Sequence, residues 1–212
     1  MQRLIPSVKE PIPRKTVYRL SLYNRCLEQL GLAGRCTVSS EVLSKIAGVK
    51  SPQLRKDLAY CGHVGKRGLG YDVVLLRQRL AETLGISRLP GVVLVGTGNL
   101  GSALLRYQDG FAKEGFEITA AFDAQPQKRS DDISVPILPM TELPDFISAR
   151  GVKMAILCVP GTAAQEVCNL LLVNGIQAIL NFAPVILQTP PGVAVNNVNL
   201  AIELENLSYF IK

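Results

Sequence analysis

Three glycines are spaced for binding a dinucleotide. The stretch Gly96-Thr-Gly98-Asn-Leu-Gly101 follows an apolar run at residues 92–95 and precedes a helix-favouring run that begins at Ser102. In a strand–turn–helix of this kind the first glycine makes the turn, the second admits a pyrophosphate, and the third lets helix and strand pack closely. The helix N-terminus adds N–H donors and a positive dipole. We therefore assign to the cofactor Gly96, Thr97, Gly98, Asn99, Leu100 and Gly101.

An acidic side chain lies where such a site needs one. A second apolar run, residues 117–122, ends in Asp123, which is 22 positions beyond Gly101. This is close to the spacing at which a carboxylate accepts hydrogen bonds from the ribose hydroxyls of the adenosine. Because a carboxylate there repels a 2′-phosphate, the sequence indicates NAD(H) as the cofactor.

Three further apolar stretches continue the alternation of strand and helix. We expect strands over 152–159, 177–182 and 192–198, with helices over 141–150, capped by Thr141, and over 162–174. A ligand of a doubly wound sheet lies across the carboxyl ends of its strands. The residues expected to border the cofactor are therefore Val159, Pro160, Asn181, Phe182, Ala183 and Pro184. The alternative is that they are ordinary turns that end strands.

The residues for proton transfer are missing. A dehydrogenase needs a proton donor or acceptor beside the transferred hydride, most often His, Lys or Tyr. After residue 90 the chain has no histidine, four lysines and only two tyrosines, and it has no second domain large enough for a substrate. We therefore expect the cofactor to be sensed, and we predict no enzyme activity, no catalytic residue and no metal site. The alternative is a small NAD-dependent oxidoreductase with a basic accessory domain.

The charge of the chain is divided between its two halves. Residues 1–90 carry 16 Lys and Arg against 6 Asp and Glu, a balance of +10, whereas residues 91–212 carry 7 against 11, a balance of −4. A small basic region joined to a larger acidic one suggests that the first meets a polyanion. The alternative is a solvated basic surface.

The basic half has the pattern of a helix-turn-helix. Helical spacing runs from about 16 to 30, Ser39-Ser40 is a capping signal for a second helix, and Ser51-Pro52 is one for a third. Leu54 and Leu58 of this third helix would face the core of the domain. A glycine-cornered hairpin over residues 61–71 then resembles a wing. We assign to DNA Ser51, Gln53, Arg55, Lys56, Lys66 and Arg67. The same helix pattern also occurs in ordinary bundles.

The cysteines and the hydropathy predict where the protein works. The five cysteines contain no C-x-x-C pair, and no apolar run approaches the roughly 18 residues of a membrane-spanning helix. These features predict a cytoplasmic protein without a membrane partner.

Nearly the whole chain resembles the Rex family of redox-sensing transcriptional repressors. The most specific stretches are Arg55-Lys-Asp-Leu-Ala-Tyr60, Gly65-Lys-Arg-Gly-Leu-Gly-Tyr71, Val95-Gly-Thr-Gly-Asn-Leu-Gly-Ser-Ala-Leu104 and Ile179-Leu-Asn-Phe-Ala-Pro184. The resemblance implies a homodimer that binds palindromic operator DNA. It also implies that NADH releases the protein from DNA and that NAD⁺ permits or favours DNA binding. It also implies that a C-terminal helix, about 200–211, swaps into the partner subunit.

These inferences combine into an α/β fold class with two domains. We predict an N-terminal winged helix-turn-helix domain at 1–88 and a C-terminal Rossmann-like, doubly wound parallel sheet at 89–198. A swapped dimerisation helix is expected at 199–212. Leu200, Leu204 and Leu207 give that helix an apolar face that must be buried somewhere.

The chain departs from the family pattern at one position. The resemblance implies a switch in which an aspartate before the swapped helix pairs with an arginine of the first helix in one state and with a tyrosine near the glycine loop in the other. The matching positions are Arg25 and Tyr107, but the aspartate position holds Asn199. An amide can hydrogen-bond both partners, yet it brings no charge to the arginine.

Overall fold

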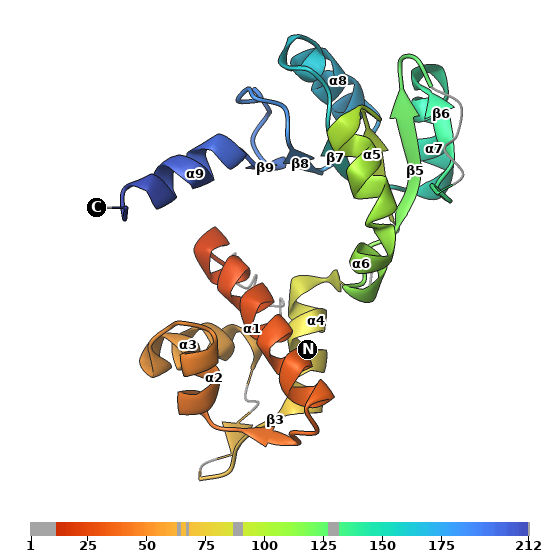
Figure 1. The fold of residues 1–212 in the computed structure, drawn as a ribbon. Helices are drawn as coiled ribbons and strands as arrows, with labels where there is room; N and C mark the ends of the chain where they lie inside the picture. The colour runs from red at the N-terminus through yellow and green to blue at the C-terminus, as the bar shows by residue number, and fades with distance from the viewer. Residues whose placement is uncertain (1–11, 63–64, 67, 87–90, 127–131, 212) are drawn as a thin grey trace, which may run out of the picture. The chain divides into compact units, whose positions relative to one another are not determined.

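The computed structural model describes residues 12–62, 65–66, 68–86, 91–126 and 132–211 (Figure 1). The chain divides into two compact units, residues 1–87 and 88–212, and each is described here by itself. Of the residues assigned to DNA, Arg67 lies outside the described residues, and only the backbone of Lys66 is described.

Among the residues that the structure describes, the N-terminal unit is built on four helices. They are α1 (Arg14–Leu32), α2 (Ser40–Ile46), α3 (Ser51–Leu58) and α4 (Val73–Leu84), with a 3₁₀ turn, η1 (Ala59–Cys61), after α3. Their inward faces form one core, whose fully buried leucines are Leu20, Leu27, Leu43, Leu54, Leu76 and Leu80. Leucines at helical spacing therefore bring the helices together as the sequence predicted.

A small antiparallel sheet completes this unit. Its strands β1 (Thr37–Val38), β2 (Gly65–Lys66) and β3 (Gly70–Asp72) lie in the order β1-β3-β2. Gly70 has φ +81°, and a Cβ there would lie 2.4 Å from the carbonyl oxygen of Val38. Only glycine therefore lets the hairpin close against β1. The expected wing is present.

One of the two helix caps predicted in this unit is wrong. Ser39 caps α2, since its Oγ accepts a hydrogen bond from the backbone N–H of Val42 at 3.1 Å. The residue before α3 is Lys50, in an extended conformation, and Ser51 is the first residue of that helix. The Ser51 hydroxyl is instead hydrogen-bonded to the hydroxyl of Ser44, at 2.7 Å.

The C-terminal unit contains a six-stranded parallel sheet. Its strands are β4 (Val92–Val95), β5 (Ile118–Asp123), β6 (Ile137–Pro139), β7 (Met154–Leu157), β8 (Ala178–Asn181) and β9 (Ala194–Asn197). They lie in the order β6-β5-β4-β7-β8-β9, so the order reverses between β4 and β7. This is the 3-2-1-4-5-6 order of dinucleotide-binding folds, whose ligand lies at that reversal. The predicted doubly wound sheet is confirmed.

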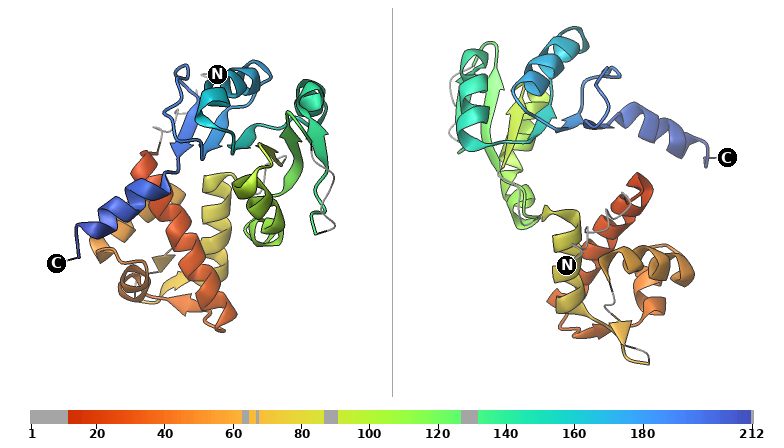
Figure 2. Two further views of the ribbon diagram at one scale, coloured as in Figure 1. Left: turned by 45° about the horizontal axis from the view of Figure 1, so that its top comes forward. Right: turned by 180° about the vertical axis from the view of Figure 1, so that it is seen from behind.

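Helices cover both faces of this sheet, as Figure 2 shows. They are α5 (Asn99–Arg106), α6 (Gln108–Lys113), α7 (Leu143–Arg150) and α8 (Gly161–Val173). Successive residues of β4 enter different cores: Val93 and Val95 pack with α7 and α8, whereas Val92 and Leu94 pack with Leu105 of α5. Every residue of β4 is buried because the strand is covered on both sides.

The helix predicted over 141–150 begins later than expected. Residues 140–142 form a 3₁₀ turn, η3 (Met140–Glu142), and α7 starts at Leu143 with Pro144 in its first turn. Thr141 therefore lies inside η3 and caps nothing. Helix α6 and strand β6 are short and were not predicted from the sequence.

The last helix, α9 (Leu200–Ser208), has no buried residue and extends away from the sheet beyond β9 (Figure 1). The side chains of its apolar face are exposed by 62% at Leu200, 67% at Leu204 and 62% at Leu207. Among the described residues, no helix is long and apolar enough to cross a membrane.

Candidate functional site

The first and third glycines of the loop after β4 are required by the packing of the chain itself. Gly96 has φ +96°, and a Cβ there would lie 2.5 Å from the carbonyl oxygen of Cys158. A Cβ on Gly101, in the first turn of α5, would lie 1.9 Å from the carbonyl oxygen of Gly96. Both positions bring backbone against backbone, so no side chain fits at either.

The second glycine differs from these two. Gly98 has φ −62° and ψ −166°, a conformation open to any residue, and a Cβ there would meet nothing within 4 Å. Gly98 is the N-cap residue of α5. Because glycine has no side chain, no side-chain hydrogen bond caps the first backbone N–H groups of this helix. The chain thus leaves open space in front of a helix N-terminus, which is a favourable place for a phosphate group.

Asp123 is tied to the same loop. Its Oδ2 accepts hydrogen bonds from the N–H of Thr97 at 2.7 Å and from the Thr97 hydroxyl at 2.9 Å, and its Oδ1 accepts from the N–H of Gln125 at 2.9 Å. Burial acts to raise the pKa of this carboxyl, but the hydrogen bonds outweigh burial and lower it. Asp123 is therefore ionised at neutral pH and holds the glycine loop against β5.

Asn181, at the end of β8, is fully buried and hydrogen-bonded within the chain. Its Nδ2 donates to the carbonyl of Val185 and to the Asn197 side chain, both at 2.9 Å, and its Oδ1 accepts from the N–H of Ala183 at 3.0 Å. These bonds fix the loop after β8 and join it to β9. Phe182 is half-buried against the core on the α5 side, whereas Pro184 is exposed.

The sheet gathers the predicted cofactor residues at one edge. The glycine loop follows β4, Asp123 ends β5, Val159 and Pro160 follow β7, and Asn181 ends β8. Because these strands are parallel, all these residues lie at the carboxyl edge, on both sides of the order reversal. The donors and the open space at Gly98 fit a dinucleotide laid across this edge.

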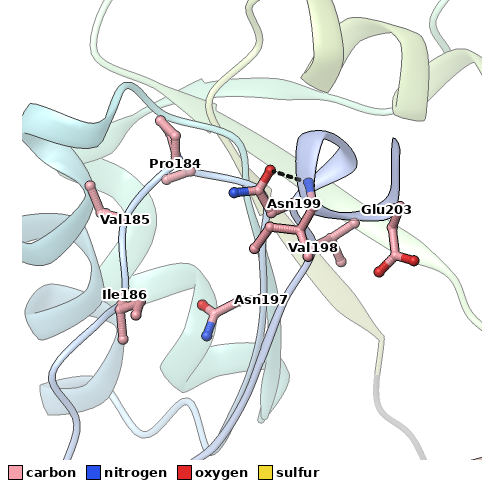
Figure 3. A pocket seen from close by; sticks show the side chains of 9 residues that line it. Pro184, Val185, Ile186, Asn197, Val198, Asn199 and Glu203 are labelled. Carbon is pink, nitrogen blue, oxygen red and sulfur yellow. Dashed lines mark hydrogen bonds between the residues drawn. The ribbon is translucent and has the colours of Figure 1, made fainter. Parts of the chain in front are cut away.

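A pocket of about 260 Å³ lies at the β8–β9 end of this edge (Figure 3). Its lining is Ala183, Pro184, Val185, Ile186, Asn197, Val198, Asn199, Ile202 and Glu203. Its lining includes Ala183 and Pro184, two of the predicted cofactor residues, but none of the glycines, so the pocket lies beside the candidate dinucleotide site.

Asn199 has a structural role that the sequence analysis missed. Its Oδ1 accepts hydrogen bonds from the N–H groups of Ala201 at 3.0 Å and Ile202 at 3.4 Å, which makes it the N-cap of α9. Asparagine and aspartate cap helices equally well. The departure from the family pattern therefore preserves the start of α9. The other two residues of the expected switch, Arg25 in α1 and Tyr107 between α5 and α6, are both exposed.

Of the residues assigned to DNA in α3, Gln53, Arg55 and Lys56 are exposed and Ser51 is half-buried. Leu54 and Leu58 are buried, as their helical phase predicted. Arg55 donates a hydrogen bond from Nη1 to the Ser40 hydroxyl at 3.2 Å, and Lys56 lies beside it on the outer face. Gln53 donates from Nε2 to the carboxylate of Asp57 at 2.8 Å.

Asp57 itself was missed by the sequence analysis, although its position gave a signal. It is three residues beyond the buried Leu54 and therefore on the inner face of α3, where a carboxylate needs partners.

Comparisons with known proteins give a family match in each of the two units. Residues 11–59 match the family model of a putative DNA-binding protein N-terminus, and residues 89–185 match that of a CoA binding domain. The redox-sensing transcriptional repressor Rex of Desulfitobacterium hafniense is 44% identical over 199 residues, which are 93% of this chain and 94% of that protein. The Rex repressor of Syntrophobacter fumaroxidans is 44% identical over 202 residues, which are 94% of this chain and 96% of that protein.

Solved structures give the same result. The repressor RSP in complex with β-NAD⁺ and operator DNA matches with a TM-score of 0.86 and 34% identity, over 96% of this chain and 94% of that chain. RSP in complex with β-NADH matches with a TM-score of 0.82 and 33% identity, over 96% of this chain and 95% of that chain.

Proposed function

This chain belongs to the Rex family of redox-sensing transcriptional repressors, and we propose that it binds operator DNA as a homodimer and leaves it when NADH binds. The protein is a regulator and not an enzyme, which sets aside the oxidoreductase alternative. Its cofactor is NAD(H), and its second partner is double-stranded DNA. A repressor of this kind acts in the cytoplasm.

The open space at Gly98 is the observation that carries this proposal. Packing of the chain explains Gly96 and Gly101, but no contact among the residues that the structure describes explains a glycine at position 98. A pyrophosphate that approaches the backbone at the α5 N-terminus does explain it.

We assign the remaining cofactor residues by their positions at the carboxyl edge. Thr97, Asn99 and Leu100 present the glycine loop, Asp123 faces the adenosine ribose, and Val159 and Pro160 flank the cofactor from β7. Phe182, Ala183 and Pro184 form the wall from β8. Asn181 acts through its hydrogen bonds, by holding that wall in place.

The bound nicotinamide supplies a difference in charge, since its oxidised ring is a cation and its reduced ring is neutral. An apolar wall at Phe182 disfavours the cation by desolvation. NADH therefore binds more tightly than NAD⁺ and favours the state of the dimer that releases DNA.

On the DNA side we assign Gln53, Arg55 and Lys56 to the major groove and Ser51, Lys66 and Arg67 to the phosphates. We assign residues 1–88 to a DNA-binding domain, residues 89–198 to an NAD(H)-binding domain and residues 199–212 to a dimerisation helix. Arg25, Tyr107 and Asn199 form the switch between states, with a hydrogen bond from Arg25 to the amide oxygen of Asn199 in place of an ion pair.

The test is a titration of a fluorescent palindromic duplex, recovered by this protein from a randomised library, with no cofactor, with NAD⁺ and with NADH at fixed salt. We expect NADH to weaken binding at least tenfold, which is about 1.4 kcal/mol, and NAD⁺ to leave it intact. Equal affinity under all three conditions would reject the proposed function.

A further inference from the structure

Asp57, in the last turn of α3, is the one buried carboxylate among the residues that the structure describes, with 1% of its surface exposed. Each of its two carboxylate oxygens accepts two hydrogen bonds. Oδ2 accepts from Arg19 Nε at 2.6 Å and from the Tyr23 hydroxyl at 2.9 Å. Oδ1 accepts from Arg19 Nη2 and from Gln53 Nε2, both at 2.8 Å.

These bonds join α3 to α1. Arg19 and Tyr23 are four residues apart on one face of α1, and Thr16, one turn earlier, accepts a further hydrogen bond from Arg19 at 3.1 Å. An arginine that contacts both oxygens of a carboxylate through two nitrogens permits a narrow range of orientations. Apolar contacts such as those of Leu54 and Leu58 are not directional, so they restrict the rotation of this eight-residue helix less than the two-nitrogen contact of Arg19 with Asp57 does.

We propose that Asp57, Arg19 and Tyr23 are positioning residues that set the rotation of α3, and thereby decide which bases Arg55 and Lys56 reach. The proposal rests on the proposed function, since it concerns the reading of operator DNA. Arg55 and Lys56 directly precede Asp57 on the same helix. If α3 rotates about its axis, both side chains therefore face different bases.

The electrostatics agree with this geometry. Burial acts to raise the pKa of Asp57, but the hydrogen bonds from Arg19, Tyr23 and Gln53 outweigh it and lower the pKa. The pKa of the Tyr23 hydroxyl is raised, first by burial and then by its bond to the carboxylate, so Tyr23 remains a donor at neutral pH. The hydrogen bond to Asp57 uses one of the two Nε2 hydrogens of Gln53, so this side chain keeps one N–H and its carbonyl oxygen for a base edge.

A buried ion pair is weak evidence for stability, because hydrophobic replacements of similar size are often neutral or stabilising. This makes positioning separable from folding. The triple variant Arg19→Met, Tyr23→Phe, Asp57→Leu removes the guanidinium and the phenol hydroxyl on α1 and the carboxylate on α3, and it leaves the net charge unchanged.

The chain offers a matched control. Arg77 Nη2 and Glu28 Oε1 form an ion pair at 2.9 Å that joins α4 to α1 and does not involve α3. The variant Arg77→Met, Glu28→Leu removes an interhelical ion pair from the same unit, again without a change in net charge.

The measurement is the ratio of the affinity for the selected palindrome to the affinity for an unrelated duplex of equal length, at several salt concentrations, with Tm recorded for each variant. We expect the triple variant to lose at least tenfold in this ratio, while its affinity for the unrelated duplex and its salt dependence stay unchanged, because phosphate contacts are retained. The control variant keeps the ratio of the wild type.

A folded triple variant with the ratio of the wild type would overturn the proposal. Arg19→Lys keeps the charge but cannot contact both oxygens in the same way, so it tests the claim even if the triple variant does not fold. We expect a partial loss of the ratio, and an unchanged ratio would overturn the positioning role. A wild-type protein that does not prefer the palindrome would instead overturn the proposed function.

Discussion

Gly98 and Gly101 differ in what the chain requires of them, and this difference gives a prediction for single residues. Gly98→Ala adds a methyl group where the chain has open space, so we expect an unchanged Tm and an NADH affinity at least tenfold lower, about 1.4 kcal/mol. Gly101→Ala forces a methyl group onto the Gly96 carbonyl and should cost about 1–3 kcal/mol of stability. Calorimetry of unfolding and of NADH binding measures both. Unchanged NADH affinity in Gly98→Ala would contradict the assigned pyrophosphate site.

Asp123 should decide between NADH and NADPH. Its lowered pKa keeps it charged at neutral pH, and the charge repels a 2′-phosphate. In Asp123→Asn, whose amide oxygen can still accept from Thr97, we expect the preference for NADH over NADPH to fall by about tenfold. Competition binding measures the ratio, and Asp145→Asn, an exposed position in α7, is the control. If the preference survives in Asp123→Asn, the carboxylate does not set it.

The sequence predicted single residues well where a local motif defined them. The three glycines and Asp123 belong to one strand–turn–helix–strand unit, so their spacing alone predicted their places. The hydrogen-bond partners of Asn181 and Asp57 could not be predicted in this way. Their partners Asn197 and Arg19 lie 16 and 38 residues away, and only the folded chain brings each pair together.

At the scale of elements, the start of α9 depends on Asn199. Removing its cap in Asn199→Ala should destabilise α9 by about 1 kcal/mol, whereas Asn199→Asp retains the cap and adds a charge that the helix N-terminus favours. Hydrogen exchange of residues 201–204 distinguishes the two variants. We expect faster exchange in the alanine variant and exchange like that of the wild type in the aspartate variant. Equal protection in Asn199→Ala would show that the cap is dispensable.

The apolar face of α9 should be the contact between subunits. Leu204 is 67% exposed in the single chain, and burying a leucine is worth about 1.5–3 kcal/mol. Leu204→Glu should therefore convert dimers to monomers without lowering the Tm of the C-terminal unit. Light scattering measures the mass, and Glu205→Gln, an exposed neighbour on the same helix, is the control. A dimeric Leu204→Glu variant would place the interface elsewhere.

Elements with strong periodicity or motifs were predictable, and short ones were not. The helical spacing of α1 and the apolar runs of β4 and β5 appeared directly in the sequence. Helix α6 has six residues and strand β6 has three, too few to show a period. Local capping signals also misled at Ser51 and Thr141, because the backbone entered these helices one or two residues away from the expected position.

At the scale of the whole molecule, the two units have separate cores and opposite charges. The basic unit of helices and hairpin suits a polyanion, and the acidic unit with its parallel sheet suits a dinucleotide. The fold class followed from the sequence because each unit carries its own pattern. The sequence does not show how NADH in one unit changes DNA binding by the other. That coupling is a free-energy difference between states of a dimer.

The central claim is that NADH and operator DNA oppose each other through the dimer. Linkage requires that operator weakens NADH binding by the same factor by which NADH weakens operator binding. The decisive measurement is the NADH affinity of the free protein and of the protein saturated with the selected palindrome, at one salt concentration. We predict an affinity at least tenfold lower for the DNA-bound protein, equal to the factor measured from the DNA side. The same NADH affinity with and without DNA would contradict the account.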